Sequence, residues 1–259
     1  MKAQNIAPEI LTKIWKAYWI DVPGEPAHEY GVYNFRKEIT LASKPSSFIV
    51  HVSADNRYKL FVNGRLASLG PARGDLYHWN FETVDIAPLL QNGSNTIAAV
   101  VWNFGAMRPE AQISYQTAFI LQGNSALEQI INTDTSWQCI RDSSYLPLIP
   151  QLVYSYYVAG PGEHIDQNQT PGNWKINNYD AANWKQAHAL FNGLPKGVFN
   201  YTLGWMLIPR QIPQMELTPQ RLAATRSAEG ISLPPNFPSQ KTKSHHSSYY
   251  ISNAIAPRQ

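Results

Sequence analysis

A stretch of alternating residues around an Asn-Gly dipeptide restricts the possible folds more than any other part of the chain. Apolar side chains occupy every second position between residues 57 and 62, and Asn63-Gly64 follows at once. Period-two alternation is typical of a strand with one buried face. Asn-Gly favours a two-residue hairpin because both residues tolerate positive φ angles. The sequence therefore predicts an antiparallel hairpin between strands at 57–62 and 65–69.

Short runs of the same kind recur along the rest of the 259 residues, separated by 15 glycines and 19 prolines. Strands are predicted at residues 32–41, 47–53, 57–62, 82–86, 95–102, 113–121, 127–133, 152–158 and 202–208. Brief helical turns are predicted at residues 8–14 and 87–91. Many short strands between Gly and Pro turns are typical of a β-sandwich, so the predicted fold class is all-β.

The composition argues against several partners and signals. The formal net charge of +3 is too small to favour a nucleic acid or an anionic membrane as partner. No apolar run approaches the roughly 20 residues of a membrane helix, and the N-terminus shows no apolar signal-peptide core. The single cysteine, Cys139, excludes a disulfide within the chain and is predicted to be buried. The seven histidines show no metal-binding spacing, so no metal or cofactor is predicted.

Three motifs are similar to those of a known family. They read ADNRYKLFVNG (54–64), GPARGD (70–75) and NTIAAVVWNFG (95–105). Together they resemble the N-terminal β-sandwich of bacterial alpha-L-rhamnosidases, a glycoside hydrolase family. The resemblance extends over about residues 14–235. It implies a galactose-binding-like jelly-roll β-sandwich, followed by the start of a second, truncated β-domain. The parent family is often exported, but this chain leaves its own location open.

The resemblance divides the chain into four parts. Residues 1–31 are predicted as an arm that packs on the sandwich, residues 32–210 as the jelly roll, and residues 211–235 as the start of the second β-domain. Residues 236–259 contain no acidic residue and no sustained alternation, so they are predicted to be a disordered or frameshifted tail. A natural flexible tail is the alternative.

The resemblance also implies a function. Family members hydrolyse terminal alpha-L-rhamnose with inversion, and the two carboxyl groups for this reaction lie in a helical barrel. No segment here matches that barrel, so no catalytic residue is assigned. The chain is predicted to be a non-catalytic N-terminal fragment of such an enzyme. Two alternatives stay open: a stand-alone carbohydrate-binding module, and an accessory subunit that docks onto a separate catalytic domain.

Aromatic residues near loops are the candidates for carbohydrate binding, because pyranose rings stack on exposed aromatic faces. Tyr77 and Trp79 follow GPARGD, and Trp102 ends a predicted strand. The functional interpretation is a platform for rhamnose-containing glycans, or a surface that contacts the catalytic domain of the parent enzyme. The structural interpretation is packing in the core and at its rim.

Two loops carry further candidates. In GPARGD, Gly70 and Gly74 are predicted to supply unusual φ angles, and Arg73 to tie the loop to carbonyls or a carboxylate. This turn explains the Arg-Gly-Asp tripeptide without a role in adhesion. In the segment PGEHIDQ, Glu163 and Asp166 lie beside a histidine. These acidic residues indicate either a weak calcium or sugar site or a solvated loop.

Overall fold

The computed structural model describes residues 5–148, 160–198 and 204–218, with the short pieces 228–229, 232 and 251–252. The chain divides into two compact units, Met1–Pro213 and Gln214–Gln259. In the second unit, β16 (Ala228–Glu229) pairs in parallel with β17 (Ile251–Ser252). No helix in the described part of the chain has the length and apolar character needed to cross a membrane.

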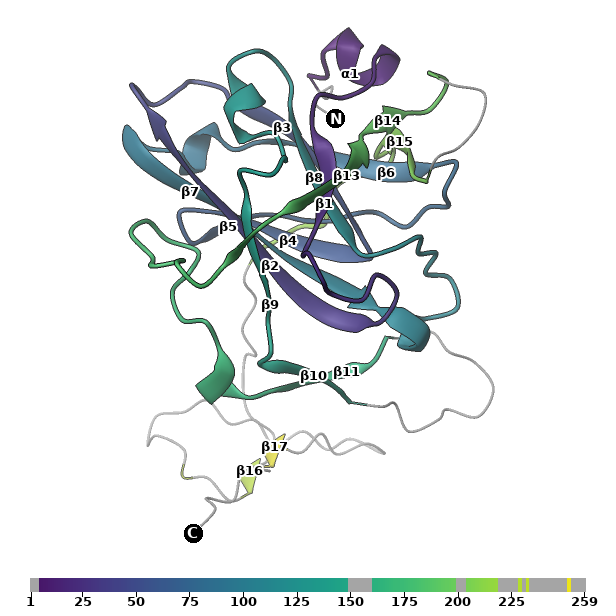
Figure 1. Cartoon of the computed structure of the whole chain (residues 1–259), viewed down its shortest axis with the longest axis vertical. Helices are drawn as coiled ribbons and strands as arrows, with labels where there is room; N and C mark the ends of the chain where they lie inside the picture. The colour runs from purple at the N-terminus through teal and green to yellow at the C-terminus, as the bar shows by residue number, and fades with distance from the viewer. Residues whose placement is uncertain are drawn as a thin grey trace, which may run out of the picture. The chain divides into compact units, whose positions relative to one another are not determined.

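Two β-sheets form the first unit (Figure 1). The seven-stranded sheet has the order β13 (His188–Asn192), β1 (Tyr18–Asp21), β8 (Ala118–Gly123), β3 (Ile49–Asp55), β6 (Trp79–Asp85), β15 (Met206–Pro209), β14 (Leu194–Pro195). The six-stranded sheet has the order β12 (Lys185–Gln186), β9 (Gln138–Arg141), β2 (Tyr30–Leu41), β7 (Gly93–Phe104), β4 (Arg57–Val62), β5 (Arg65–Gly70). A separate ribbon pairs β10 (Tyr145–Leu148) with β11 (Gly162–Ile165).

Helical structure in the described residues is confined to short pieces outside the strands. They are α1 (Pro8–Thr12) and the 3-10 turns η1 (Ala87–Leu89), η2 (Gly105–Met107), η3 (Glu128–Ile131) and η4 (Gln167–Gln169). The first two fall within the predicted helical turns at 8–14 and 87–91, and Pro88 lies in the first turn of η1, where its missing N–H leaves no bond unmade.

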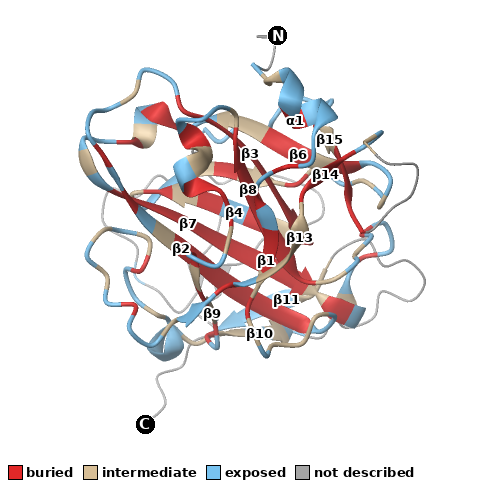
Figure 2. Ribbon diagram, turned by 45° about the horizontal axis from the view of Figure 1, so that its top comes forward, coloured by how far each residue is buried: buried red, intermediate tan, exposed pale blue. Residues whose placement is uncertain are grey.

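Side-chain alternation places one set of residues between the two sheets. Phe35 on β2 and Ala99 on β7 are register partners that face inward, whereas Val32 and Trp102 are partners that face outward. The inner set forms the main core, which includes Phe35, Val52, Leu60, Phe119 and Trp137. These buried strands run through the middle of the unit (Figure 2). The arrangement confirms the predicted jelly-roll sandwich.

Each sheet also carries a buried cluster on its outer face. The cluster on the seven-stranded sheet contains Trp15, Trp19, Trp79, Phe81 and Trp205. The cluster on the six-stranded sheet contains Tyr30, Val32, Val100, Trp102 and Trp174. Aromatic side chains therefore fill three apolar layers rather than one, and most tryptophans are removed from solvent.

The strands β4 and β5 form the predicted hairpin. Val62 pairs with Arg65 across the turn, and the φ angles of Asn63 and Gly64 are 50° and 77°. Positive φ at both central residues is the geometry of a two-residue turn, so the prediction is confirmed. The Asn63 side chain also accepts the N–H of Thr96 at 2.9 Å, which ties the turn to β7.

The structure corrects the prediction of a strand at residues 127–133. The segment contains the 3-10 turn η3 instead. The buried Glu128 carboxylate accepts the N–H groups of Ser125 at 2.8 Å and Ile49 at 3.3 Å, and these bonds fix a turn. The predicted strand at 152–158 lies outside the described residues.

The segment predicted as an arm, residues 1–31, also contributes a strand. Within it, β1 pairs with β13 and β8, so that Ile20 lies opposite Ala189 and Phe119. The first compact unit ends at Pro213, shortly after the predicted end of the jelly roll at residue 210. The predicted parts 211–235 and 236–259 lie largely outside the described residues.

Candidate functional site

The three predicted carbohydrate-binding residues lie at separate places. Tyr77 is 57% exposed, whereas Trp79 is 3% and Trp102 is 6% exposed. Trp79 belongs to the outer cluster of the seven-stranded sheet, where its Nε1 donates to Ser53 Oγ at 3.1 Å. Trp102 belongs to the outer cluster of the six-stranded sheet. The structure therefore does not bring the three rings into one platform. Of the three, Tyr77 presents its ring to solvent, and sugar binding stays a prediction.

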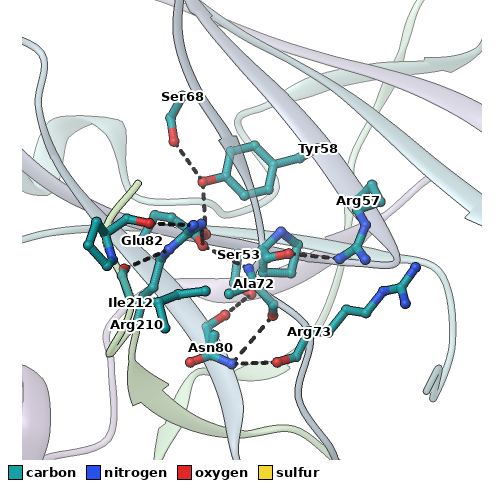
Figure 3. Close-up of polar contacts among 12 residues, drawn as sticks. Ser53, Arg57, Tyr58, Ser68, Ala72, Arg73, Asn80, Glu82, Arg210 and Ile212 are labelled. Carbon is teal, nitrogen blue, oxygen red and sulfur yellow. Dashed lines mark hydrogen bonds and ion pairs between the residues drawn. The ribbon is translucent and has the colours of Figure 1, made fainter. Parts of the chain in front are cut away.

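A buried carboxylate anchors the loop that carries Tyr77 (Figure 3). Residues 70–78 are called the GPARGD loop below. Glu82 on β6 is fully buried, and its Oε1 accepts the N–H of Ala72 at 2.8 Å. Arg210 Nη1 donates to the same oxygen at 3.1 Å, and the Tyr58 hydroxyl donates to Oε2 at 3.0 Å. Burial raises the pKa of Glu82, and these three donors oppose the rise. Both oxygens of the carboxylate thus accept hydrogen bonds from internal donors.

The anchor connects β4, β5, the GPARGD loop, β6 and the segment after β15. Arg210 follows β15, and besides Glu82 it contacts the carbonyl oxygens of Ile212 through Nε at 3.0 Å and Pro213 through Nη2 at 2.8 Å. The Tyr58 hydroxyl lies 3.0 Å from Ser68 Oγ on β5. A buried polar network with every member bonded holds its elements in one arrangement. The loop is therefore a fixed feature of this end of the sandwich.

Two further side chains hold the carbonyls of the GPARGD loop. Arg57 Nη1 donates to the Pro71 carbonyl at 2.7 Å, and Asn80 Nδ2 donates to the Arg73 carbonyl at 3.0 Å. The Arg73 side chain has no hydrogen bond or ion pair within the described part of the chain. The prediction that Arg73 ties the loop is therefore wrong, because Arg57 and Asn80 do so from outside it.

Gly70 and Gly74 are needed for space rather than for unusual φ. Neither glycine has a positive φ angle. A Cβ atom on Gly70 would lie 2.3 Å from Glu82 Oε2, and one on Gly74 would lie 2.0 Å from the His78 carbonyl oxygen. The prediction of unusual φ angles is wrong at both positions. Close approach of backbone is the physical reason for both glycines: Gly70 approaches β6, and Gly74 approaches the other end of the loop itself.

The tip of the loop presents polar groups beside Tyr77. Asp75, His78 and Lys196 are exposed. Asp75 Oδ1 accepts the N–H of Tyr77 at 2.8 Å and lies 3.1 Å from His78 Nδ1. Lys196 Nζ contacts His78 Nε2, which links the loop to the segment between β14 and β15. An exposed ring next to a few fixed donors and acceptors is an arrangement that suits sugar hydroxyls.

A second buried carboxylate lies at the end of β3. Asp55 Oδ2 accepts the N–H of Tyr115 at 2.6 Å and the indole N–H of Trp205 at 3.0 Å. Burial raises the pKa of Asp55, and these bonds oppose the rise. The sequence analysis missed Asp55 and Glu82. An acidic residue within or at the end of an alternating apolar run, as in IVHVSAD and FETV, is the signal that marks both.

Of the two acidic residues in the segment PGEHIDQ, Asp166 makes local hydrogen bonds. Glu163 lies on the exposed strand β11, and Asp166 Oδ1 accepts the N–H of Asn168 at 3.0 Å as the cap of η4. Within the described ranges, no group of three or more His, Cys, Asp or Glu side chains is placed to hold a metal ion. Cys139 is buried, as predicted, and burial raises the pKa of its thiol to about 12.

Comparison with known proteins shows what this architecture is similar to. Residues 43–221 match a family model described as the alpha-L-rhamnosidase N-terminal domain. A GH78 family rhamnosidase of Bacillus sp. GL1 superimposes with a TM-score of 0.66 at 25% identity, over 78% of this chain and 20% of that chain. No curated protein matches the chain.

Two further solved structures share the fold. The alpha-L-rhamnosidase of Aspergillus terreus superimposes with a TM-score of 0.53 at 19% identity, over 74% of this chain and 22% of that chain. The alpha-L-rhamnosidase of Dictyoglumus thermophilum gives a TM-score of 0.51 at 18% identity, over 68% of this chain and 21% of that chain. The chain thus spans about a fifth of the length of these three enzymes.

Proposed function

Since the chain belongs to the family of alpha-L-rhamnosidase N-terminal domains, we propose that it is the non-catalytic N-terminal module of an alpha-L-rhamnosidase-like glycoside hydrolase. The parent activity is the hydrolysis of terminal alpha-L-rhamnose with inversion. The observation that carries the proposal is the extent of the match, because the sandwich aligns with about a fifth of the Bacillus rhamnosidase. The remaining part of such an enzyme supplies the reaction.

The state of the buried carboxylates supports a non-catalytic role. Glycosidases of the usual kind need two carboxyl groups about 5–9.5 Å apart that face the sugar. Asp55 and Glu82 are both buried and bonded to internal donors. A groove of about 430 Å³ beside α1 has Glu9 as its acidic lining residue, without a second carboxylate. Asp55 and Glu82 therefore serve the fold rather than a sugar.

The test is hydrolysis of an aryl alpha-L-rhamnoside by the purified chain. We expect release no faster than in buffer, because enzymatic rate enhancements span many orders of magnitude and even a weak enzyme stands above background. Glu9→Gln is the matched variant, since Glu9 is the carboxylate that lines the groove. Turnover that survives purification and is lost in this or another single acidic variant would overturn the proposal.

Carbohydrate binding by the module itself is a second candidate function, and the exposed ring of Tyr77 favours it. One stacked ring and a few hydrogen bonds contribute only slightly more free energy than the entropy lost when the sugar and its contacts are ordered. We therefore expect a dissociation constant for L-rhamnose of about 1 mM. Tyr77→Ala should weaken binding without lowering the melting temperature. Leu127→Ala, at a residue with 54% exposure, is the matched control. Equal binding by both variants would contradict a role for Tyr77. Docking onto a separate catalytic domain stays a prediction.

A further inference from the structure

Four cationic side chains lie along the outer face of the six-stranded sheet and the loop beside it. Arg57 and Lys59 are two residues apart on β4, so they project from the same face. This is the outer face, because Arg57 pairs with Trp102 and Lys59 Nζ lies 5.0 Å from the centroid of the Trp102 ring. Arg73 lies near Arg57 and Lys175 near Lys59. These four residues are called the cation stripe.

The cation stripe holds like charges close together. Burial lowers the pKa of Arg57 to about 10, and the positive charge of Arg73 adds to the shift. Figure 3 shows both guanidinium groups on the same side of the loop. Burial lowers the pKa of Lys175, where Asp142 opposes the shift and Lys59 adds to it. Like charges held near each other favour binding of an anion between them.

The carboxylates nearest the cation stripe are bonded to other groups. None of its four members forms an ion pair with a carboxylate within the described part of the chain. Two carboxylates lie near Arg57. Glu82 is bonded to Arg210, Tyr58 and the loop backbone, and Asp55 is bonded to Tyr115 and Trp205. Asp142, near Lys175, accepts Asn34 Nδ2 at 2.8 Å and the N–H of Ser144 at 3.1 Å. The exposed side chains of Lys59 and Arg73 are therefore open to an external anion.

Contacts with rings and carbonyls fix the positions of these charges. Lys175 Nζ lies 4.9 Å from the Phe61 ring centroid and 5.1 Å from that of Trp174. Lys59 lies over Trp102, and Arg57 is bonded to the Pro71 carbonyl. Cation–π contacts and hydrogen bonds restrict these long side chains before a ligand arrives, so less rotamer freedom is lost on binding.

The surroundings of the stripe favour an acidic glycan over a nucleic acid. Trp102 and Trp174 are 6% and 2% exposed, so neither ring is available to stack on bases, which is how single-stranded nucleic acids are usually held. The whole chain carries a formal charge of only +3. The positive charge is thus a local feature of one face rather than a property of the surface.

We propose that the cation stripe binds a carboxylate-bearing polysaccharide, a polyuronate, along the outer face of β4. The Arg57 and Arg73 guanidinium groups offer paired donors that match the two oxygens of a sugar carboxylate. Lys59 and Lys175 supply point charges to carboxylates further along the same polymer. This inference rests on the proposed function, because membership in a glycoside hydrolase family is what makes a glycan the expected polyanion.

The experiment measures binding of the full chain to polygalacturonate at low ionic strength. The test variant is Lys59→Gln/Arg73→Gln, at two exposed positions, and the matched control is Lys13→Gln/Lys44→Gln, which removes the same charge from exposed positions elsewhere. We expect the dissociation constant to rise about tenfold or more in the test variant and less than about twofold in the control. Added salt should weaken binding, and fully methyl-esterified polygalacturonate should not bind. Melting curves check that both variants fold.

Several results would overturn the cation stripe as a polyuronate site. They are no binding of polygalacturonate, an equal loss in both double variants, retained binding of the methyl ester, or equal binding of single-stranded DNA. None of them bears on rhamnoside hydrolysis or on L-rhamnose binding at Tyr77. A chain that hydrolyses rhamnosides would instead contradict the proposed function, whatever it binds.

Discussion

Tyr77 and Trp79 are two residues apart in the sequence, yet their side chains have opposite surroundings. Tyr77 lies in solvent near the end of the GPARGD loop, whereas Trp79 begins β6 and packs against Trp205, at a centroid distance of 6.2 Å. Replacing Trp79 with alanine should lower the free energy of unfolding by about 3–5 kcal/mol, the usual cost of a large core truncation. Urea denaturation measures this, with Tyr77→Ala as the exposed control. An unchanged midpoint in Trp79→Ala would contradict its place in the outer cluster.

His51 is a buried residue whose charge should govern stability in mild acid. It is fully buried, with Nδ1 3.0 Å from Thr83 Oγ1 and Nε2 2.9 Å from Asn124 Oδ1. Burial lowers the pKa of His51 to about 4. Between pH 6.5 and pH 4, the unfolded chain therefore binds a proton at this imidazole that the folded protein does not. The contribution of neutral His51 to the free energy of unfolding is fully present above pH 6.5 and is lost as the pH drops through this window.

The expected loss from His51 by pH 4 is about 3 kcal/mol. His51→Gln cannot take up this proton, so its stability should change less over the same range even if it is lower at pH 7. The measurement is the free energy of unfolding of both proteins in urea at pH 7 and pH 4. If the difference between the two proteins is the same at both pH values, His51 is not the neutral buried group described here.

At the scale of elements, the β4–β5 hairpin depends on one glycine. Gly64 has a φ angle of 77°, and a Cβ atom there would lie 2.9 Å from Ile176 Cγ2. Gly64→Val should therefore destabilise the fold by about 1–3 kcal/mol, the range for strained backbone at such a position. Gly64→Asn is the matched control, because asparagine tolerates positive φ better than valine. Equal denaturation midpoints for the two variants would contradict the expected backbone strain in Gly64→Val.

Strands with clear period-two alternation could be predicted from the sequence. The hairpin at Asn63-Gly64 was predictable because turn chemistry and period-two alternation agree there. Residues 127–133 lack this alternation, because their apolar residues are Leu127, Ile130 and Ile131. In the structure the buried Glu128 carboxylate bonds to a neighbouring N–H group and fixes η3. The same carboxylate also accepts the N–H of Ile49 on β3, 79 residues earlier in the chain. Local pattern alone does not contain this information.

The candidate site was predictable in part, for a related reason. Sequence position correctly put Tyr77 on a loop, but it did not reveal that Trp79 and Trp102 are covered. Both rings face away from the main core, where a two-layer sandwich would leave them exposed. Trp15, ahead of β1, covers the cluster around Trp79, and the segment around Trp174 covers the cluster around Trp102. Outer layers of this kind depend on tertiary packing that periodicity cannot report.

At the scale of the whole first unit, the segment after β15 completes the sandwich. The Arg210 side chain supplies the positive charge beside the buried Glu82 carboxylate. The backbone N–H of Arg210 donates to the Phe81 carbonyl at 3.0 Å. The carbonyls of Ile212 and Pro213 hold the other side of the guanidinium. The GPARGD loop, more than a hundred residues earlier, therefore depends on residues near the end of the unit. A boundary drawn at β15 would remove its counter-charge.

Two shortened chains test this dependence. A chain that ends after Pro213 should unfold at nearly the same denaturant concentration as the full chain, because it keeps Arg210 and its carbonyl partners. A chain that ends after Pro209 leaves the buried Glu82 carboxylate unpaired, which typically costs about 3–5 kcal/mol. Arg210→Met in the full chain isolates the side chain from the lost backbone bond and should show most of this cost. If the chain ending at Pro209 is as stable as the one ending at Pro213, the Glu82 anchor does not stabilise the GPARGD loop.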